Sequence, residues 1–414
     1  MTMGRVKLFA ACQAVILALV ALALYFHPDI TSSLYRPTPL RGHDSPDPLR
    51  SSILSRDNLT AYVSAILDPD DTHMPRLECP KPDLVRYEYL KPAFREPSEI
   101  RYFFALNLRA CLPLLPRLIG SVVEAIRFLG PENCAISIVE GNSPDGTAEV
   151  LAALQPHLDK LTTVHLELSN DIDPLAGARF TKLAELRNLA LEPMLSDPTR
   201  FSNTTVIFLN DVAICLEDIL ELVHQRHVLG ADMTCAFDWI YGEDEPSFYD
   251  VYVARAINGD TFFEIPPDLS WRFSSNLFWN EPTSQERLEA HRPFQVFACW
   301  NGAVAFTAAP LVEGRVAFRS SRADAGECHQ GEPQLFCKDM WFQGYGKIAV
   351  VPSVNLEYSN ENGKRIKEDK GYVSQWISQG AGPEDKVEWQ PPPDQVKCMP
   401  TFDQQTWRPW NETL

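Results

Sequence analysis

The chain has 414 residues, 45% of them hydrophobic and 22% charged, which suits one large catalytic domain with appendages or two domains. Its 37 Lys and Arg residues stand against 55 Asp and Glu residues, a net charge of −18. Such an acidic chain argues against a nucleic-acid partner, although a locally basic pocket can still hold an anionic ligand.

An uncharged apolar run fills residues 8–26, and Arg5 and Lys7 precede it. As a helix this run spans roughly 28 Å, close to the thickness of the hydrocarbon core of a bilayer. The charge balance on its two sides predicts a cytoplasmic tail at 1–7, a transmembrane signal anchor at 8–26 and a lumenal remainder. The alternative is a cleaved signal peptide, for which residues 21–23 (Ala-Leu-Ala) offer a site.

Glycosylation sequons and cysteines also fit a lumenal chain. Three sequons begin at Asn58, Asn203 and Asn411, and nine of the ten cysteines follow the predicted anchor without a CxxC pair. Disulfides are the expected use of several of these cysteines in an oxidising lumen, and the odd number leaves at least one thiol free or paired between chains. Cys328 and Cys337 are close enough in sequence to be a candidate pair.

Proline-rich sequence at 27–98 predicts an extended stem. From residue 99 the pattern alternates between strands and helices. Strands are predicted at 102–108, 135–140, 164–169, 204–210 and 231–237, with helical spacing around 118–129, 147–160, 183–190 and 216–229. This order predicts an α/β fold with a mostly parallel sheet.

Aromatic loops follow residue 240, and their flat rings suit an acceptor platform as well as a core. A short helix at 334–344 and a strand at 347–356 then close the predicted catalytic domain, 99–360. We expect the remaining residues, 361–414, to form a tail that wraps the surface.

The segment 206–212 reads VIFLNDV and ends a predicted buried strand with Asn210 and Asp211. An unpaired buried carboxylate costs several kcal/mol, so a cation or firm donors are expected beside Asp211. Strand ends are where ligands bind in such sheets, and Mn²⁺ or Mg²⁺ on a nucleotide diphosphate is a natural partner. Glycosyltransferases of the GT-A type use this arrangement, usually with two carboxylates. The alternative is an Asn-Asp turn at a helix entry.

A second polar loop follows the strand at 135–140. Its sequence, VEGNSPDGT, resembles the loop of nucleotide-sugar transferases that meets the base and ribose, which makes Glu140, Asn142 and Asp145 candidate donor-binding residues. The alternative is a Pro-Gly turn in which Ser143 caps the next helix and Pro144 takes its first position.

Arg187 and Asn188 lead towards the same sheet edge and are candidate ligands of phosphates, because Arg offers bidentate donors. Their alternative is a solvated helix face. The sequence holds no GxxxxGK[ST] phosphate loop, no GxSxG elbow and no HExxH motif.

Taken together, these stretches resemble the fungal capsule-associated, cryptococcal α-1,3-mannosyltransferase-like family over roughly 100–358. The resemblance rests on VEGNSPDGT, LAELRNLAL, VIFLNDVAICLEDILEL, ADMTCAFDW, FYDVYVARAINGD, PFQVFACWNGAVAF and LFCKDMW. It implies a type II Golgi membrane protein with a GT-A-like fold, GDP-mannose as donor, an α-mannoside as acceptor and retention at the anomeric carbon.

The resemblance also suggests site residues. Asp211 matches the family's Leu-Asn-Asp position, the expected metal ligand, and Trp300 and Asn301 match a Cys-Trp-Asn-Gly stretch expected near donor and acceptor. Lys338 and Asp339 match its Cys-Lys-Asp stretch, which makes Lys338 a candidate donor ligand.

Glu332 is kept within Gly-Glu-Pro, where the family's Ser-Glu-Cys is expected, and the lost Cys puts a local disulfide in doubt. Glu332 and Asp238 are the candidate carboxylates near the reacting carbon. His329 and Asp339 are candidates for further metal ligands beside Asp211.

The sequence therefore predicts a metal-dependent retaining α-1,3-mannosyltransferase that uses GDP-mannose with Mn²⁺ (or Mg²⁺) in the Golgi membrane, with its catalytic domain in the lumen. Two alternatives remain: a retaining transferase using another nucleotide sugar, such as a UDP-sugar, and a non-catalytic homologue that binds glycans or acts as a scaffold.

Overall fold

The computed structural model describes residues 53–91, 99–175, 177–241, 245–377 and 386–413, which belong to one compact unit that begins at residue 52. The predicted tail at 1–7 and the predicted anchor at 8–26 lie outside these residues. Among the described helices, none is long and apolar enough to cross a membrane. The predicted fold class is corrected in this respect.

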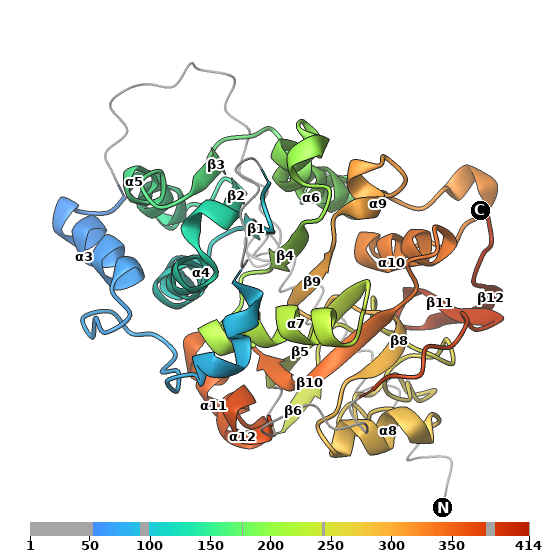
Figure 1. Cartoon of the computed structure of the whole chain (residues 1–414). Helices are drawn as coiled ribbons and strands as arrows, with labels where there is room; N and C mark the ends of the chain where they lie inside the picture. Colours follow the sequence, from blue (N-terminus) through green and yellow to red (C-terminus); the bar gives the residue numbers. More distant parts are fainter. Residues whose placement is uncertain (1–52, 92–98, 176, 242–244, 378–385, 414) are drawn as a thin grey trace, which may run out of the picture. The chain divides into compact units, whose positions relative to one another are not determined.

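A ten-stranded sheet forms the centre of the unit, in the order β3-β2-β1-β4-β9-β5-β10-β8-β7, with β6 beside β5 (Figure 1). The strands are β1 (Tyr102–Leu108), β2 (Cys134–Glu140), β3 (Thr163–Glu167), β4 (Thr205–Leu209), β5 (Met233–Tyr241), β6 (Pro246–Phe248), β7 (Arg255–Ala256), β8 (Phe294–Ala298), β9 (Ala303–Thr307) and β10 (Ile348–Leu356). The five predicted strands of the first half and the strand at 347–356 are all present, and no strand end differs from its prediction by more than four residues.

The predicted mostly parallel sheet is wrong for the second half of the chain. Strands β3, β2, β1 and β4 run parallel, but β9 lies antiparallel between β4 and β5. Strand β8 is also antiparallel to its neighbour β10, and only β5 and β10 are parallel there. Both β8 and β9 come from the apolar stretch 293–306, whose turn at Asn301 and Gly302 has φ of 54° and 82°. The sheet is therefore mixed.

Helices cover both faces of the sheet. They are α3 (Arg56–Leu67), α4 (Leu115–Leu129), α5 (Thr147–Leu158), α6 (Arg179–Leu195), α7 (Leu216–Val228), α8 (Pro282–Glu289), α9 (Ala309–Val312), α10 (Glu332–Phe342), α11 (Asn360–Lys370) and α12 (Val373–Trp376). One core cluster joins the sheet to α6, α9 and α10, and the other joins it to α4, α5 and α7.

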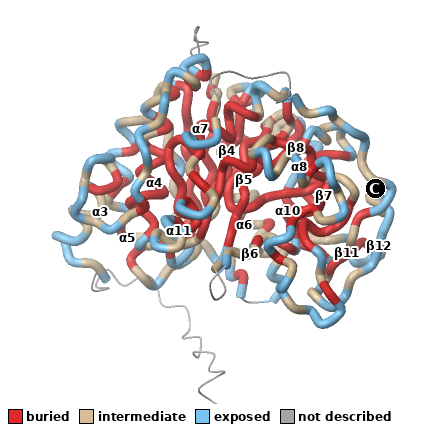
Figure 2. The backbone as a smooth tube through the Cα atoms, turned by 90° about the horizontal axis from the view of Figure 1, so that it is seen from below, coloured by how far each residue is buried: buried red, intermediate tan, exposed pale blue. Residues whose placement is uncertain are grey.

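Successive side chains along a strand point to opposite faces of the sheet and so belong to different core clusters. In β1, Phe103 and Ala105 belong to the cluster with α6, whereas Phe104 and Leu106 belong to the cluster with α4. Figure 2 shows the buried backbone concentrated along strands such as β4 and β5. This burial on both faces explains why the strands read as nearly continuous apolar runs.

The predicted stem is wrong for the described residues 53–91, because they pack on the domain. Helix α3 lies against α4 and α5, and the 3-10 helix η1 (Leu84–Leu90) lies against α7. Ile66 and Tyr87 are fully buried there. The prolines of this stretch therefore separate short packed elements.

The C-terminal boundary at 360 also needs correction, because α11 and α12 continue the domain. Beyond them, β11 (Gln395–Thr401) and β12 (Gln404–Pro409) form a two-stranded sheet. The backbone N–H of Lys397 donates to Gly259 O at 2.8 Å, which ties this sheet to the domain.

Three disulfides join Cys79 to Cys215, Cys235 to Cys299 and Cys328 to Cys398. The candidate pair Cys328–Cys337 is therefore wrong. The Cys337 side chain points from α10 into the core, where its Sγ lies 3.5 Å from Cys299 O, whereas Cys328 faces the C-terminal sheet. Cys111, Cys134 and Cys337 remain as buried thiols.

Candidate active site

The parallel strands end level with one another and bring three polar loops to one edge of the sheet. Leu106 of β1 is in register with Leu209 of β4, and Leu108 is in register with Glu140 of β2. The residues that follow these strands, Asn210 and Asp211 among them, therefore meet at the edge where α/β sheets bind ligands.

Asp211 is mostly buried and receives no side-chain hydrogen bond from any residue in the described part of the chain. Burial raises the pKa of its carboxyl to about 6, although its own backbone N–H and the charge of Arg187 act in the opposite direction. The carboxylate forms part of the wall of a pocket. A partly buried carboxylate whose one donor is its own backbone N–H suits a cation, because carboxylate oxygens are the ligands that Mg²⁺ and Mn²⁺ prefer.

Asn210 is held by the β8–β9 turn. Its side-chain oxygen accepts a hydrogen bond from Trp300 Nε1 at 3.1 Å, and its backbone N–H donates to Gly302 O at 2.9 Å. Asn301 donates its side-chain amide to Ala236 O at 2.8 Å. Trp300 and Asn301 are both buried, and their predicted place near donor and acceptor stays a prediction. Trp300 holds the side chain of Asn210, the residue before Asp211.

Arg187 and Glu332 form a buried ion pair beside Trp300. Arg187 Nε lies 2.9 Å from Glu332 Oε1, with little exposure on either side chain. The guanidinium also stacks on the ring of Trp300, 4.3 Å from its centroid, and one of its terminal nitrogens is buried without a partner. The structure therefore brings these predicted residues together, but as a buried support and not as an open phosphate clamp.

Two further carboxylates lie beside this support. Asp238 of β5 is fully buried and accepts a hydrogen bond from Tyr358 Oη at 2.6 Å, while its other oxygen has no partner. Burial and the charge of Asp250 raise the pKa of Asp238 well above its usual range. Asp250 accepts from the backbone N–H of Asn301 at 2.9 Å, and burial raises its pKa to about 6.

Asp250 and Tyr358 were not expected from the sequence. Asp250 lies within the stretch FYDVYVARA, which the sequence predicts to be part of an aromatic loop. The single carboxylate among these aromatic residues is the feature that could have indicated a site residue. Tyr358 follows β10, and nothing in its local sequence indicates that it contacts Asp238.

At the end of β2 and in the loop that follows, the carboxylates of Glu140 and Asp145 accept hydrogen bonds from nearby backbone N–H groups. Glu140 accepts a hydrogen bond from Ser143 N at 3.0 Å. Asp145 accepts from Thr147 N at 3.0 Å and from Leu112 N at 3.1 Å. Helix α5 therefore starts at Thr147 with Asp145 before it, and the alternative with Ser143 and Pro144 at the helix start is wrong.

Asn142 stays exposed at the same edge and donates its side-chain amide to Asn170 O at 2.8 Å. Asn188, in contrast, makes two hydrogen bonds with the backbone of Phe318, at 2.8 and 3.1 Å. Its predicted role at the donor phosphates is therefore wrong, since the side chain is committed to joining α6 to the 318 loop.

The predicted ligands on and before α10 belong to a different cluster. The Lys338 ammonium is buried against Glu327 at 2.6 Å, and Asp339 pairs with Arg319, also at 2.6 Å. The ring of His329 packs on Phe180 with centroids 5.0 Å apart. Within the described ranges no three His, Cys, Asp or Glu side chains converge as a metal site. The combination of Asp211, His329 and Asp339 as metal ligands is therefore wrong, and Lys338 is not free for a donor.

Comparison with known proteins decides the family. Residues 101–339 match the family model described as cryptococcal mannosyltransferase 1. The chain is also 37% identical over 353 residues to the alpha-1,3-mannosyltransferase CMT1 of Cryptococcus neoformans var. neoformans serotype D, covering 81% of this chain and 72% of that protein. The chain belongs to the cryptococcal mannosyltransferase 1 family. It is accordingly a glycosyltransferase, and the resemblance seen in the sequence is confirmed.

Solved structures are much more distant from this mannosyltransferase family member. Staphylococcus aureus TarS 1–349 is 12% identical with a TM-score of 0.35, covering 63% of this chain and 60% of that one. GalNAc-T7 with UDP, GalNAc and Mn²⁺ is 13% identical with a TM-score of 0.39, covering 70% and 55%. Mannosyltransferase PcManGT from Pyrobaculum calidifontis with GDP-Man and Mn²⁺ is 13% identical with a TM-score of 0.34, covering 80% and 76%. Similarity this low transfers no site residue.

Proposed function

We propose that this mannosyltransferase transfers mannose from GDP-mannose to an α-mannoside and forms an α-1,3 linkage with retention. The observation that carries the proposal is Asp211, a partly buried carboxylate at the ligand edge of the sheet that accepts no hydrogen bond from any other residue in the described part of the chain. The α-1,3 linkage is drawn from the name of the Cryptococcus relative.

A divalent cation, Mn²⁺ or Mg²⁺, fits at Asp211. When bound there it would neutralise charge on the departing diphosphate. Asp211 supplies one hard oxygen ligand, and because the described residues hold no group of three His, Cys, Asp or Glu side chains that could bind a metal, diphosphate oxygens and water would complete the coordination.

The burial of the other carboxylates favours a front-side route. The bond between the anomeric carbon and the phosphate oxygen breaks while the acceptor hydroxyl oxygen forms the new bond on the same face, and its proton passes to the leaving phosphate. A covalent intermediate on either carboxylate predicted near the reacting carbon would need that carboxylate to be accessible, but Asp238 is fully buried and Glu332 is paired with Arg187. We therefore assign Asp238 and Glu332 positioning roles, in place of the catalytic roles expected from the sequence.

Disulfides support an oxidising compartment of the secretory pathway, such as the Golgi lumen, as the place of action. The three sequon asparagines, Asn58, Asn203 and Asn411, are all exposed, as glycosylation requires. Their modification stays a prediction.

The test uses the full chain purified from a secretory host. It is incubated with GDP-mannose or a set of UDP-sugars, α-mannobiose and Mn²⁺ or EDTA. A trisaccharide detected by mass only with GDP-mannose and metal supports the proposal, and NMR of the product gives the linkage. A product made only from a UDP-sugar favours the alternative donor. GDP binding without any product favours a non-catalytic homologue.

A further inference from the structure

A pocket of about 720 Å³ opens beside Asp211, on the side of the sheet covered by α3 and α4. Its walls come from α3, from the segment 74–78, from the β1–α4 connection and from the start of α11. Its size lies within the range of about 300–1,000 Å³ typical of small-molecule sites. Of the residues discussed at the candidate active site, Asp211 and Tyr358 line this pocket, and no ligand has been assigned to it above.

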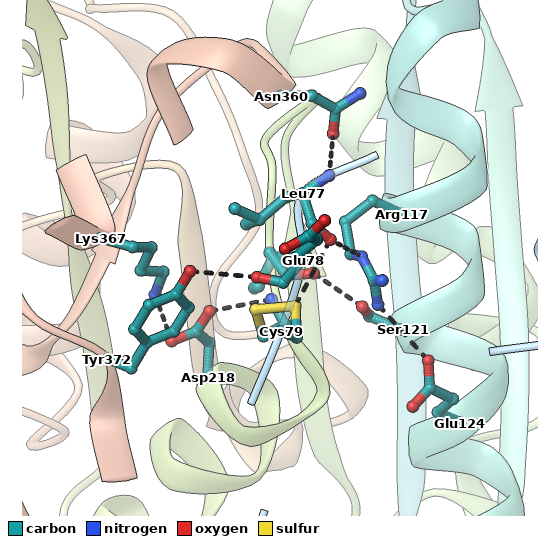
Figure 3. Close-up of a disulfide and its surroundings, with 12 residues drawn as sticks. Leu77, Glu78, Cys79, Arg117, Ser121, Glu124, Asp218, Asn360, Lys367 and Tyr372 are labelled. Atoms are coloured by element: carbon teal, nitrogen blue, oxygen red, sulfur yellow. Dashed lines mark hydrogen bonds and ion pairs between the residues drawn. A yellow bond between two sulfur atoms is a disulfide. The ribbon is translucent and has the colours of Figure 1, made fainter. Parts of the chain in front are cut away.

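The outer wall is a segment of residues 74–79, which we call the strap, and the structure holds it firmly (Figure 3). Leu77 N donates to Asn360 Oδ1 at 3.0 Å, and Leu77 O accepts from Arg117 Nε at 2.7 Å. The disulfide from Cys79 to Cys215 anchors its end. A wall fixed in this way is preorganised for a ligand, because little conformational freedom is left to lose on binding.

The charges of the lining disfavour an anionic ligand. Three carboxylates line the pocket, those of Glu78, Asp211 and Glu361, against the two cations of Arg76 and Lys364. The Arg76 guanidinium is already committed, since it donates to backbone carbonyls at the end of α3 and just after it, for example to Ala65 O at 2.8 Å. With Asp211 assigned to the cation, the other two carboxylates balance the two cations, so this lining has no net positive charge to hold a diphosphate and suits a neutral ligand.

The remaining lining suits a sugar. Apolar surface comes from Leu77, Leu114 and Pro116 and from the ring of Tyr62, and polar groups come from α11. A pyranose has an apolar face of C–H groups and a rim of hydroxyls, so it matches a pocket that is mostly apolar with a few placed polar groups.

We propose that this pocket is the acceptor subsite and that it takes a neutral α-mannoside. Its position beside Asp211 would bring the reacting hydroxyl next to the donor diphosphate. The inference rests on the proposed function for the identity of the sugar, but the pocket itself can be tested separately.

The experiment compares two pocket variants with a matched control. Met74→Trp fills the pocket from the strap, and Lys364→Ala removes a polar group from α11. Arg365→Ala is the control, because Arg365 is an exposed residue of α11 that lies over the ring of Tyr241 and does not line the pocket. We expect Met74→Trp to raise the KM for α-mannobiose at least tenfold and Lys364→Ala several-fold. The Kd for GDP and the rate of GDP-mannose hydrolysis by water should stay within twofold in both, and Arg365→Ala should leave all three quantities unchanged.

Unchanged acceptor KM in folded, active Met74→Trp would overturn the proposal. So would a rise in acceptor KM caused only by Trp271→Ala, which alters a separate exposed aromatic surface. If the wild type transfers nothing from GDP-mannose, binding of α-mannobiose is measured by calorimetry in the presence of GDP. Binding to the wild type that Met74→Trp abolishes still supports the pocket, whereas no binding, or equal binding to both, contradicts it.

Discussion

At the sheet edge, one residue, Asp211, faces the proposed ligand, and several neighbouring residues hold the loop of Asp211 in place. Asp211 accepts no hydrogen bond from another described residue, whereas Asn210 and Asp250 are bonded to the β8–β9 turn. Because burial raises the pKa of the Asp211 carboxyl, we expect its ionised form to cost stability when no cation is bound. Such a cost is typical of a functional group, and it leads to a prediction about stability.

Asp211→Asn is expected to abolish transfer and to stabilise the metal-free protein. The pKa of Asp211 is raised from 3.8 to about 6 by folding, so the stability associated with its neutral form is present below pH 4 and lost as the pH rises through 6. Asn mimics the neutral form, and the gain at pH 7 should be on the order of 2–3 kcal/mol. Denaturant unfolding in EDTA at pH 4 and pH 7 measures it. A variant less stable than the wild type at pH 7 would argue against a strained carboxylate.

Arg187 and Glu332 are predicted to couple strongly. Removing one partner of a buried pair leaves an uncompensated charge, so Arg187→Met and Glu332→Gln should each lower the free energy of unfolding by about 3 kcal/mol. The double variant should lose clearly less than the sum of the two, which a double-mutant cycle measures. Additive losses would show that the two side chains do not act as a pair.

Among the elements, the β8–β9 turn has the greatest influence on the site. It carries Trp300, Asn301 and Gly302, and all three bond to or pack against the end of β4 or β5. The turn exists because β9 inserts between β4 and β5, which is a long-range pairing that local sequence spacing does not indicate. The turn therefore supports Asn210, the residue that precedes Asp211.

Gly302→Ala tests this role. Gly302 has φ of 82°, and an added Cβ would lie 3.1 Å from Val212 Cγ1, so the change should cost about 1–3 kcal/mol and displace Asn210. The control is Gly314→Ala, which has φ of 69° but nothing within 4 Å of the new Cβ. We expect kcat to fall at least tenfold only in Gly302→Ala, measured by transfer of radiolabelled mannose. Equal kcat values for the two variants would remove the turn from the account.

At the scale of the whole molecule, the first half of the fold could be predicted from sequence and much of the second half could not. Strands β1 to β5 alternate with helices, and each apolar run ends at a clear turn. The antiparallel strands β8 and β9 lie in one apolar stretch that local periodicity does not divide. The segment 53–91 is tied to the domain by the Cys79–Cys215 disulfide, whose partners are 136 residues apart in sequence, and by the packing of α3 on α4.

The same limit explains the site. Asp211 was found because a carboxylate after a buried strand is conspicuous in sequence. Lys338 and Asp339 were assigned to the donor and the metal because the sequence does not show their ion-pair partners. Only the fold shows that Lys338 pairs with Glu327 and that Asp339 pairs with Arg319. Tyr358 reaches Asp238 across 120 residues of sequence, which no spacing argument detects.

Replacing both Cys79 and Cys215 by Ser is expected to act on the whole molecule and on the strap. Loss of a disulfide that closes a long loop should lower the free energy of unfolding by about 2–4 kcal/mol. Replacing Cys328 and Cys398 in the same way should cost a comparable amount, since that pair ties the C-terminal sheet. Only the first pair should raise the KM for α-mannobiose, and a rise in both would point to general loosening of the fold.

The most direct measurement is transfer from GDP-mannose to α-mannobiose by the wild type and Asp211→Asn, each with Mn²⁺ and with EDTA. We predict a trisaccharide from the wild type with Mn²⁺ only, and none from the variant under either condition although it remains folded. A trisaccharide formed by Asp211→Asn at a rate near that of the wild type would contradict the central claim that Asp211 holds the cation of the donor site.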